Sequence, residues 1–472
     1  MPFAGTATPA EVTASPTTQK TPVLTAPSTS APAASSPHTP SAPPALPADA
    51  DPLPVSATLA ANEAMAARRR QGQPVLPLAF GEAGLPAPPG LRDALAAATA
   101  SNAYGPVAGL DSLRSAAASY WQRRGLPTGP DAVVCGPGSK PLLFGLLLAT
   151  GADVAVPRPS WVSYAAQASL IGVRPHFVPA APGEGGICDP DALGAAVTAA
   201  RAAGRQIRSV VVTLPDNPTG RLPRPATVQA FCAVAAEHDL IIISDEIYRD
   251  LVHDPAATPV LSPATVAPER TVVTTALSKS FALGGWRLGA ARMPDGPLGG
   301  WLRRQLLGIS SEIWSAPAAP IQQAAAVAFK EPKQIAERIS RSRSLHATIS
   351  RAVAGACTAA GLDVPQPQAA FYVYPDFEPW RAHLARRHDV TTGAGLAGLL
   401  LERYGAGTLP GSAFGESQQA LRLRLATGSL YGDTDDAQET ALAAADPLAL
   451  PWIAAHITRL EEILADLGPP GA

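Results

Sequence analysis

The sequence predicts an α/β fold whose large domain holds a mostly parallel sheet covered by helices on both faces. Between residues 131 and 293, short apolar segments alternate with alanine-rich segments of helical character, such as 190–203 and 226–237. The apolar segments are rich in β-branched residues, as in 209–214, 240–244 and 271–277, and are predicted to be buried strands. Ligands of such sheets bind at the carboxyl ends of the strands, so we expect the functional site there.

Composition narrows the class of protein further. The chain has 472 residues, a net charge of −2 and 46% hydrophobic residues, which suits a water-soluble protein of two or more lobes and favours neither nucleic acid nor an acidic membrane as a partner. Cys135, Cys188, Cys232 and Cys357 lie far apart, which favours reduced thiols in a cytoplasmic protein. Charge, proline or glycine interrupts every apolar run before it could span a bilayer.

The chain divides into four segments by composition and pattern. Residues 1–52 are mostly Pro, Ala, Ser and Thr, so we expect a disordered tail, and an inert extension is favoured over a partner-binding segment. An N-terminal arm and part of a small domain are assigned to 53–100, and the large domain to 101–320. Residues 321–472 are assigned to a long connecting helix, interrupted at Pro332, and a C-terminal small domain.

The segment 271–277 delivers Lys279 into a run of small residues, and Arg287 follows eight residues later. Burial disfavours the ammonium form and lowers the pKa of a lysine, which prepares the amine to attack an aldehyde and hold it as a Schiff base. The planar fork of donors on Arg287 suits a phosphate. Taken alone, a lysine near a strand end is more often a surface charge, so the interpretation depends on the whole stretch.

Two other strand ends carry polar residues. After the segment 132–135, a loop containing Gly138, Ser139 and Lys140 leads into an apolar helix, and free amides at a helix N-terminus attract anions. We expect the backbone and Ser139 to bind a phosphate there, with Lys140 beside them. Asp245 follows the apolar segment 240–244, where a carboxylate is unfavourable unless it is paired.

The stretch 278–289, Ser-Lys-Ser-Phe-Ala-Leu-Gly-Gly-Trp-Arg-Leu-Gly, resembles the lysine signature of the class I/II aminotransferases, and further motifs of that family follow its order from about residue 75 to 430. The resemblance implies a fold-type I transferase dependent on pyridoxal 5'-phosphate, with a smaller α+β domain beside the large one. It implies that Lys279 forms the Schiff base and that Arg287 binds the phosphate. Ala276 stands where the family usually has Gly or Ser, so Ser278 is expected to supply that hydroxyl.

The same resemblance implies further cofactor contacts. Asn217, in Asn-Pro-Thr-Gly, and Tyr248 are expected to bind the phenolic oxygen, while Asp245 pairs with the pyridine nitrogen in preference to Glu246. Trp161 is expected to stack on the ring. Tyr104 is expected to reach the phosphate of a neighbouring chain, which implies a homodimer with shared sites.

Substrate contacts follow from the resemblance in the same way. Gly81 belongs to a segment that closes over the substrate, although Ala83-Gly84 here replaces the Pro-Asp of the family. Arg422 is expected to bind the α-carboxylate, with Arg424 as the alternative, because alternation places both on one face of the strand 421–426. Phe371 is expected to line the pocket.

The function implied is transfer of an amino group between an L-amino acid and a 2-keto acid. The alternative is an enzyme of the same fold that eliminates, replaces, oxidises or joins groups on an amino acid in specialised biosynthesis. A ligand sensor within a transcription regulator is a further class, but the tail lacks the charge of a DNA-binding helix. We expect small-molecule partners and a second copy of the chain, with no metal ion, nucleic acid or membrane.

Overall fold

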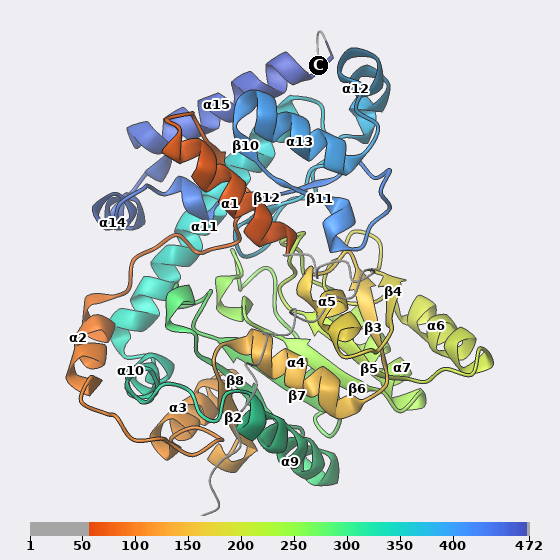
Figure 1. The fold of residues 1–472 in the computed structure, drawn as a ribbon, viewed down its shortest axis with the longest axis vertical. Helices are drawn as coiled ribbons and strands as arrows, with labels where there is room; N and C mark the ends of the chain where they lie inside the picture. Colours follow the sequence, from red (N-terminus) through yellow and green to blue (C-terminus); the bar gives the residue numbers. More distant parts are fainter. Residues whose placement is uncertain (1–55, 470–472) are drawn as a thin grey trace, which may run out of the picture. The chain divides into compact units, whose positions relative to one another are not determined.

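The computed structural model describes residues 56–469, so the predicted tail, 1–52, lies outside the described residues. Seven strands form the main sheet in the order β2-β8-β7-β6-β5-β3-β4 (Figure 1). Their bounds are β2 Val133–Gly136, β3 Asp153–Arg158, β4 Pro175–Pro179, β5 Ile207–Thr213, β6 Ile241–Asp245, β7 Thr271–Ala276 and β8 Gly289–Arg292. Within this sheet only β8 runs antiparallel to its neighbours. The mostly parallel sheet predicted from the sequence is confirmed.

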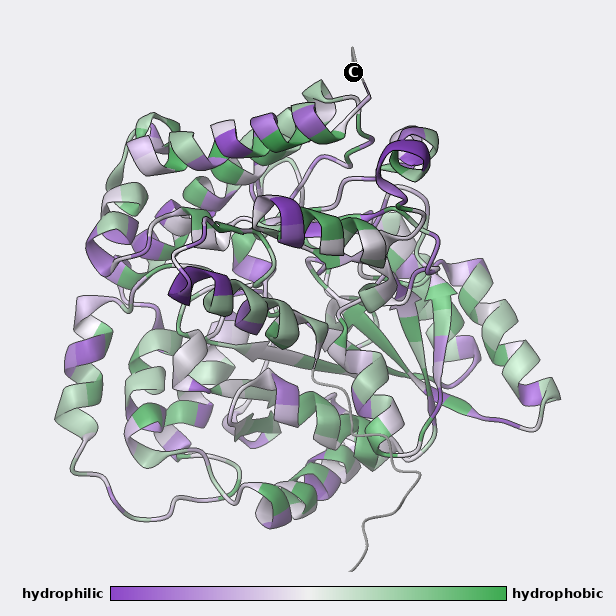
Figure 2. Ribbon diagram, turned by 45° about the horizontal axis from the view of Figure 1, so that its top comes forward, coloured by the Kyte–Doolittle hydropathy of each residue, from purple (hydrophilic) through white to green (hydrophobic). Residues whose placement is uncertain are grey.

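Helices cover both faces of this sheet because successive side chains of a strand point to opposite faces. Their bounds are α3 Asp111–Gln122, α4 Ser139–Thr150, α5 Ser163–Leu170, α6 Pro190–Ala202, α7 Pro225–Glu237, α8 Pro263–Val266, α9 Gly296–Ile313 and α10 Ala319–Lys330. Val211 and Ile243 share a core with α4, α5 and α9, whereas Val212 and Ile242 share one with α6 and α7. Figure 2 shows the strands as mostly hydrophobic and the helices as mixed in character.

A second group of elements forms around the C-terminal part of the chain. The predicted interruption at Pro332 is confirmed, since α10 ends at Lys330 and α11 spans Lys333–Ala359, reaching toward α15 in Figure 1. Two small sheets follow, β11-β12-β9 and β1-β10. The strands are β1 Leu76–Pro77, β9 Tyr372–Val373, β10 Ala406–Gly407, β11 Leu409–Pro410 and β12 Leu423–Ala426. The helices are α1 Ala57–Arg70, α2 Pro89–Ala98, α12 Arg381–His388, α13 Gly393–Tyr404, α14 Asp435–Ala443 and α15 Pro451–Leu467.

Two backbone segments of this group cross without room for a side chain. A Cβ atom on Gly84, whose φ is +60°, would lie 1.9 Å from the carbonyl oxygen of Gly428. A Cβ atom on Gly428 would in turn lie 1.9 Å from the carbonyl oxygen of Glu82. The Ala83-Gly84 pair therefore lets residues 81–85 pack directly against the turn that follows β12.

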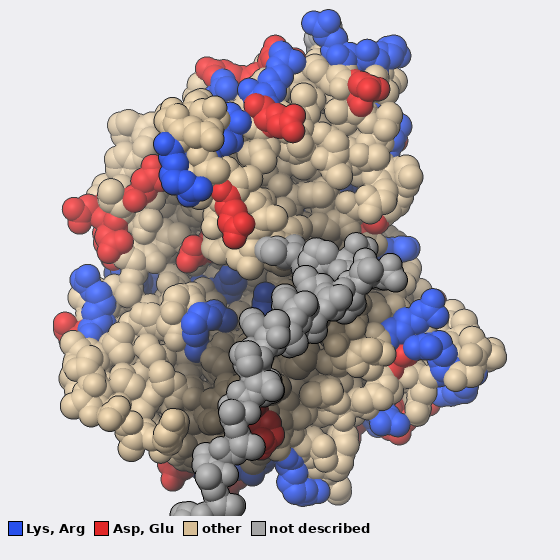
Figure 3. Space-filling view, viewed as in Figure 1, with Lys and Arg blue, Asp and Glu red and all other residues tan. Residues whose placement is uncertain are grey.

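The surface and the cysteines give no separate site. Figure 3 shows acidic and basic side chains interspersed on the face that it draws. None of the described helices is long and apolar enough to cross a membrane, and the described residues contain no cluster of His, Cys, Asp or Glu arranged to hold a metal ion. All four cysteines are buried and unpaired with one another.

The glycine crossing predicts opposite effects for two Gly→Ala substitutions. Gly428→Ala should destabilise the protein by about 1–3 kcal/mol, because the methyl group collides with backbone. Gly355→Ala is the matched control, since Gly355 lies inside α11 with nothing within 4 Å of its Cβ position. That change should stabilise by about 0.5–1 kcal/mol. Thermal unfolding of both variants checks the pair, and equal effects would contradict the crossing.

Candidate active site

A cavity of about 440 Å³ opens at the carboxyl edge of the main sheet. Its walls come from the ends of β5 and β6, the loops after β3 and β7, the start of α4 and the N-terminal arm. The structure brings most of the predicted site residues to this cavity. They are Gly81, Ser139, Lys140, Trp161, Asn217, Asp245, Tyr248, Ser278, Lys279 and Arg287.

Lys279 lies near the start of the loop that follows β7. Its Nζ donates a hydrogen bond to the backbone oxygen of Gly81. Burial lowers the pKa of Lys279 to about 8, an effect that the nearby carboxylate of Glu82 partly opposes. Roughly a tenth of this amine is therefore unprotonated at neutral pH, whereas an exposed lysine, with a pKa of about 10.4, would be almost fully charged.

Asp245 ends β6 with its side chain nearly enclosed, at 3% exposure. Its two oxygens accept hydrogen bonds from Tyr164 Oη at 2.9 Å and Thr274 Oγ1 at 3.1 Å. Burial raises the pKa of Asp245 to about 6, which those hydrogen bonds partly oppose. The carboxylate lacks a cationic partner among the described residues, so a cation bound in the cavity would stabilise it. Tyr164, in α5, is a partner of Asp245 that the sequence did not indicate.

Asn217 and Tyr248 meet on one side of the cavity. Asn217 Nδ2 donates to Tyr248 Oη at 3.5 Å, and Tyr248 Oη lies 2.7 Å from Tyr372 Oη. The expectation that Phe371 lines the cavity is wrong: Tyr372, the first residue of β9, is in the cavity wall, whereas Phe371 just before it packs edge-on to the ring of Tyr248. Tyr372 is thus a site residue that the sequence alone did not single out.

Cationic and hydroxyl groups gather at the end of the cavity beside α4. Gly138 does not line the cavity, but its φ of +93° and missing side chain let Arg287 approach, since a Cβ there would lie 2.5 Å from Arg287 Nη2. Ser139 begins α4, whose free amides favour an anion. Lys140 Nζ lies 5.1 Å from the centroid of the Trp161 ring, and burial together with Arg287 lowers the pKa of Lys140.

The two arginines of the C-terminal strand have different surroundings. Arg422 was expected in the pocket, but its side chain is 44% exposed and forms ion pairs with Asp376 at 2.8 Å and Glu416 at 2.7 Å. The location expected for Arg422 is therefore wrong. The alternative, Arg424, lines the cavity. Arg422 comes just before β12, beside Asp376, whereas Arg424 lies within β12 and reaches the cavity.

Arg424 is a buried cation at 1% exposure. Its Nη1 donates to Asn217 Oδ1 at 3.2 Å, and its Nη2 donates to the backbone oxygen of Ala79. Burial lowers the pKa of Arg424, and no carboxylate pairs with it among the described residues. Its Nε has no hydrogen-bond partner within residues 56–469. A guanidinium in this condition fits an anionic ligand that completes its hydrogen bonds.

Tyr104 and the N-terminal arm complete the account of the site. Tyr104 is 97% exposed and does not line the cavity of its own chain, so its role toward a second chain stays a prediction. Ser56, Thr58 and Leu59 from the start of α1 line the cavity without any motif that would have indicated it. Only the fold brings them there, from a point more than 200 residues before Lys279.

A seven-stranded, mostly parallel sheet with a lysine-bearing cavity at its carboxyl edge defines the fold-type I class, and comparison with known proteins specifies the family. Residues 74–431 match the model of aminotransferase class I and II. A probable aspartate/prephenate aminotransferase of Thermus aquaticus is 30% identical over 379 residues, covering 79% of this chain and 92% of the relative. The aspartate aminotransferase of Geobacillus stearothermophilus is 30% identical over 398 residues, covering 82% and 94%.

Solved structures agree with these relatives. The aspartate aminotransferase of Thermus thermophilus with maleate superposes with a TM-score of 0.73 at 27% identity, covering 87% of this chain and 97% of that one. The aromatic aminotransferase of Pyrococcus horikoshii gives a TM-score of 0.69 at 25% identity, covering 85% and 99%. The chain therefore belongs to the aminotransferase class I and II family. It is an aminotransferase, of a family that depends on pyridoxal phosphate, and these relatives give no support to the alternative chemistries.

The pKa of Lys279 predicts how cofactor uptake depends on pH. Only the free amine attacks an aldehyde, so the rate at which apoprotein combines with pyridoxal phosphate should rise with pH and level off above about 8. Measurements from pH 7 upward avoid the phosphate ionisation, whose pKa is about 6. Stopped-flow absorbance gives the rate, and Lys279→Ala is the control that should show no covalent uptake. A rate that keeps rising toward pH 10 would mean that the lysine has an ordinary pKa.

Proposed function

We propose that this chain binds pyridoxal 5'-phosphate through Lys279 and transfers the amino group of an acidic amino acid, such as aspartate, to a 2-keto acid. The observation that carries the proposal is the set of charges around one cavity. Besides Lys279, the described cations that line it are Lys140, Arg287 and Arg424, and a buried carboxylate, Asp245, lies among the walls. One cofactor phosphate and two substrate carboxylates would use these cations, and a pyridinium would pair with Asp245.

The residues present fit the cofactor group by group. Ser139, Ser278 and Arg287 offer hydroxyls and a guanidinium for the phosphate, and Trp161 offers a flat face for the ring. Asn217 and Tyr248 offer donors for the phenolic oxygen. When bound, the cofactor supplies an electron sink for negative charge at the substrate Cα.

Asp245, Lys279 and Arg424 then have separate tasks. Asp245 would keep the pyridine nitrogen protonated. The positive charge of that nitrogen would in turn stabilise the buried carboxylate, which has lost its water. The amine of Lys279, once displaced by the substrate, is a base of moderate pKa for the Cα proton. Arg424 holds the α-carboxylate and thereby orients the Cα–H bond, and Gly81 gives its backbone to the substrate wall.

Lys140 supports the choice of an acidic substrate. It is the cation that neither the phosphate nor the α-carboxylate needs, because Arg287 and Arg424 serve those groups. The curated relatives above carry names that specify aspartate, and the superposed Thermus thermophilus structure carries maleate in its title, a dicarboxylate. From the sequence, Lys140 was expected beside the cofactor phosphate. We propose instead that Lys140 binds the side-chain carboxylate of the substrate.

We also propose a homodimer in which Tyr104 contributes to the site of the partner chain. Tyr104 is 97% exposed in one chain and so is accessible to a second chain, and tyrosine is enriched at interfaces between proteins. Mixing Lys279→Ala chains with Tyr104→Phe chains should give hybrid dimers in which one site carries both wild-type residues. Activity above that of either parent, after exchange is verified by mass, supports shared sites, and a purely monomeric mass contradicts them.

The proposed reaction predicts a defined single turnover. Without keto acid, aspartate should convert the bound cofactor to pyridoxamine phosphate, and oxaloacetate should restore the aldehyde absorbance. Lys140→Gln should raise the KM for aspartate by roughly 10-fold to 100-fold, the loss of one charge-assisted hydrogen bond, and leave alanine unaffected. Release of ammonia while the aldehyde persists would contradict amino transfer, and equal loss with both substrates would contradict the role of Lys140.

The two arginines of the C-terminal strand provide a matched pair. Arg424→Gln should lower kcat/KM for every amino acid by about 100-fold or more, because a buried guanidinium that meets the α-carboxylate is removed. Arg422→Gln should stay within about 2-fold, since its partners are Asp376 and Glu416 outside the cavity. Steady-state kinetics with a monocarboxylic and a dicarboxylic donor tests both, and the reverse order would restore the role first expected for Arg422.

A further inference from the structure

The segment from Asp245 to Asp250 presents its side chains to two sides. Asp245 and Tyr248 line the catalytic cavity, whereas Glu246, Arg249 and Asp250 do not. Glu246 is buried, accepts a hydrogen bond from Ser244 Oγ at 3.1 Å and one from Ser262 Oγ, and pairs with Arg249. Glu246 and Arg249, which do not line the cavity, are therefore also held in place by hydrogen bonds and an ion pair.

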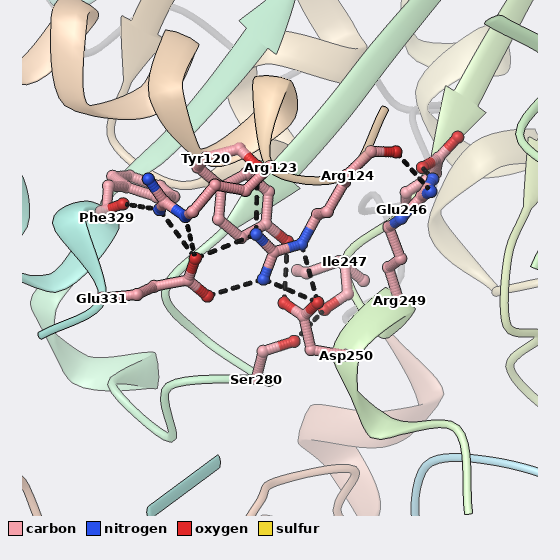
Figure 4. A network of polar contacts seen from close by, with 10 residues as sticks. All are labelled: Tyr120, Arg123, Arg124, Glu246, Ile247, Arg249, Asp250, Ser280, Phe329 and Glu331. Carbon is pink, nitrogen blue, oxygen red and sulfur yellow. Dashed lines mark hydrogen bonds and ion pairs between the residues drawn. The ribbon is translucent and has the colours of Figure 1, made fainter. Parts of the chain in front are cut away.

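The end of α3 holds this segment from behind (Figure 4). Arg124 Nε donates to Asp250 Oδ1 at 2.8 Å, and Tyr120 Oη donates to Asp250 Oδ2 at 2.8 Å. The two terminal nitrogens of Arg124 donate to Glu331 at 2.9 and 2.6 Å. Arg249 Nη2 donates to the backbone oxygen of Arg124 at 3.3 Å. One arginine thus joins α3, the end of α10 and the segment that carries Tyr248.

The lysine loop is joined to the same segment. Ser280, next to Lys279, donates its hydroxyl to the backbone oxygen of Ile247 at 3.3 Å. Phe281 follows and packs with Tyr120 and Phe329, with ring centroids 6.4 and 5.6 Å away. A shift of the 245–250 segment would consequently disturb both the groups around the phenolic oxygen and the lysine.

The cluster of Arg124, Asp250 and Glu331 consists of largely buried charges, which restrict its geometry. The side chains of Arg124, Asp250 and Glu331 are 11–14% exposed, so each has lost most of its water. Burial alone would favour neutral Glu331, but Arg124 and Arg123 hold the pKa of Glu331 below its usual range. Buried ion pairs add little net stability, because desolvation offsets their attraction, yet they require good geometry. The cluster is therefore better suited to fixing positions than to raising overall stability.

We propose that Arg124, with Asp250 and Glu331, is a positioning residue for Tyr248 and Asp245, acting from outside the cavity. The inference rests on the proposed function, since it gives Tyr248 and Asp245 their partners on the cofactor. Arg124 holds Asp250 and Arg249, the two residues that lie just after Tyr248, and thereby fixes the backbone from which the Tyr248 side chain reaches the cavity. Arg123 lies beside Arg124 but touches only Glu331 and the backbone oxygen of Phe329, so it has no such role.

The test compares Arg124→Lys, which keeps the charge and loses the fork, with Arg123→Lys as the matched control. The main readout is the pH midpoint of the visible absorbance of protein loaded with pyridoxal phosphate. That midpoint reports the nitrogen joined to Lys279 and depends on hydrogen bonds to the phenolic oxygen. We expect Arg124→Lys to shift the midpoint and to lower kcat by about 10-fold to 100-fold with little change in KM. Arg123→Lys should change neither by more than about 2-fold.

Further measurements separate positioning from mere support of the fold. If Arg124→Lys lowers only the thermal unfolding temperature and keeps the wild-type midpoint and kcat, the proposal is overturned. Should that variant not fold, Asp250→Asn is used, which removes the negative charge that pairs with Arg124 and leaves the pair with Glu331, and the same shift is expected. Failure of the proposed function is distinguishable, because wild-type protein would then bind no pyridoxal phosphate or transfer no amino group.

Discussion

Loss of water around ionised groups at the carboxyl edge of an apolar sheet is the constraint on which this structure depends. Asp245 ends a strand of isoleucines and Lys279 follows a strand buried along its whole length, while Arg424 lies within a buried strand of a small sheet, β12, that faces the same cavity. Each group would be unfavourable there without partners. The partners come from different elements: Tyr164 from α5, Gly81 from the N-terminal arm and Asn217 from the loop after β5. Each of these charged groups therefore meets its partner only when the whole fold has formed correctly.

The part of the site that lies at strand ends could be predicted from the sequence. Apolar, β-branched segments identify buried strands, and a charged residue just after such a segment has few explanations other than a ligand or a buried pair. Lys279 and Asp245 were found in this way. The role of Trp161 came from the family resemblance, because residue spacing alone does not indicate that this tryptophan stacks on a cofactor.

Other parts depended on contacts that local pattern does not encode. Alternation placed Arg422 and Arg424 on one face, but the choice between them depends on Asp376 and Glu416, which pair with Arg422 from elsewhere in the chain. Similarly, Arg123 and Arg124 are adjacent and chemically alike, yet only Arg124 reaches Asp250. In each of these two pairs of arginines, contacts with residues distant in the sequence distinguish one member from the other.

The crossing of Gly84 and Gly428 bears on how this enzyme can change during evolution. Two backbones in contact leave no volume for variation, so neither position can adjust the pocket by accepting a larger residue. The same crossing fixes the segment that carries Phe80 and Glu82, both of which line the cavity. New substrate preferences are therefore expected to arise by exchange of those neighbouring side chains, on a backbone that remains constant.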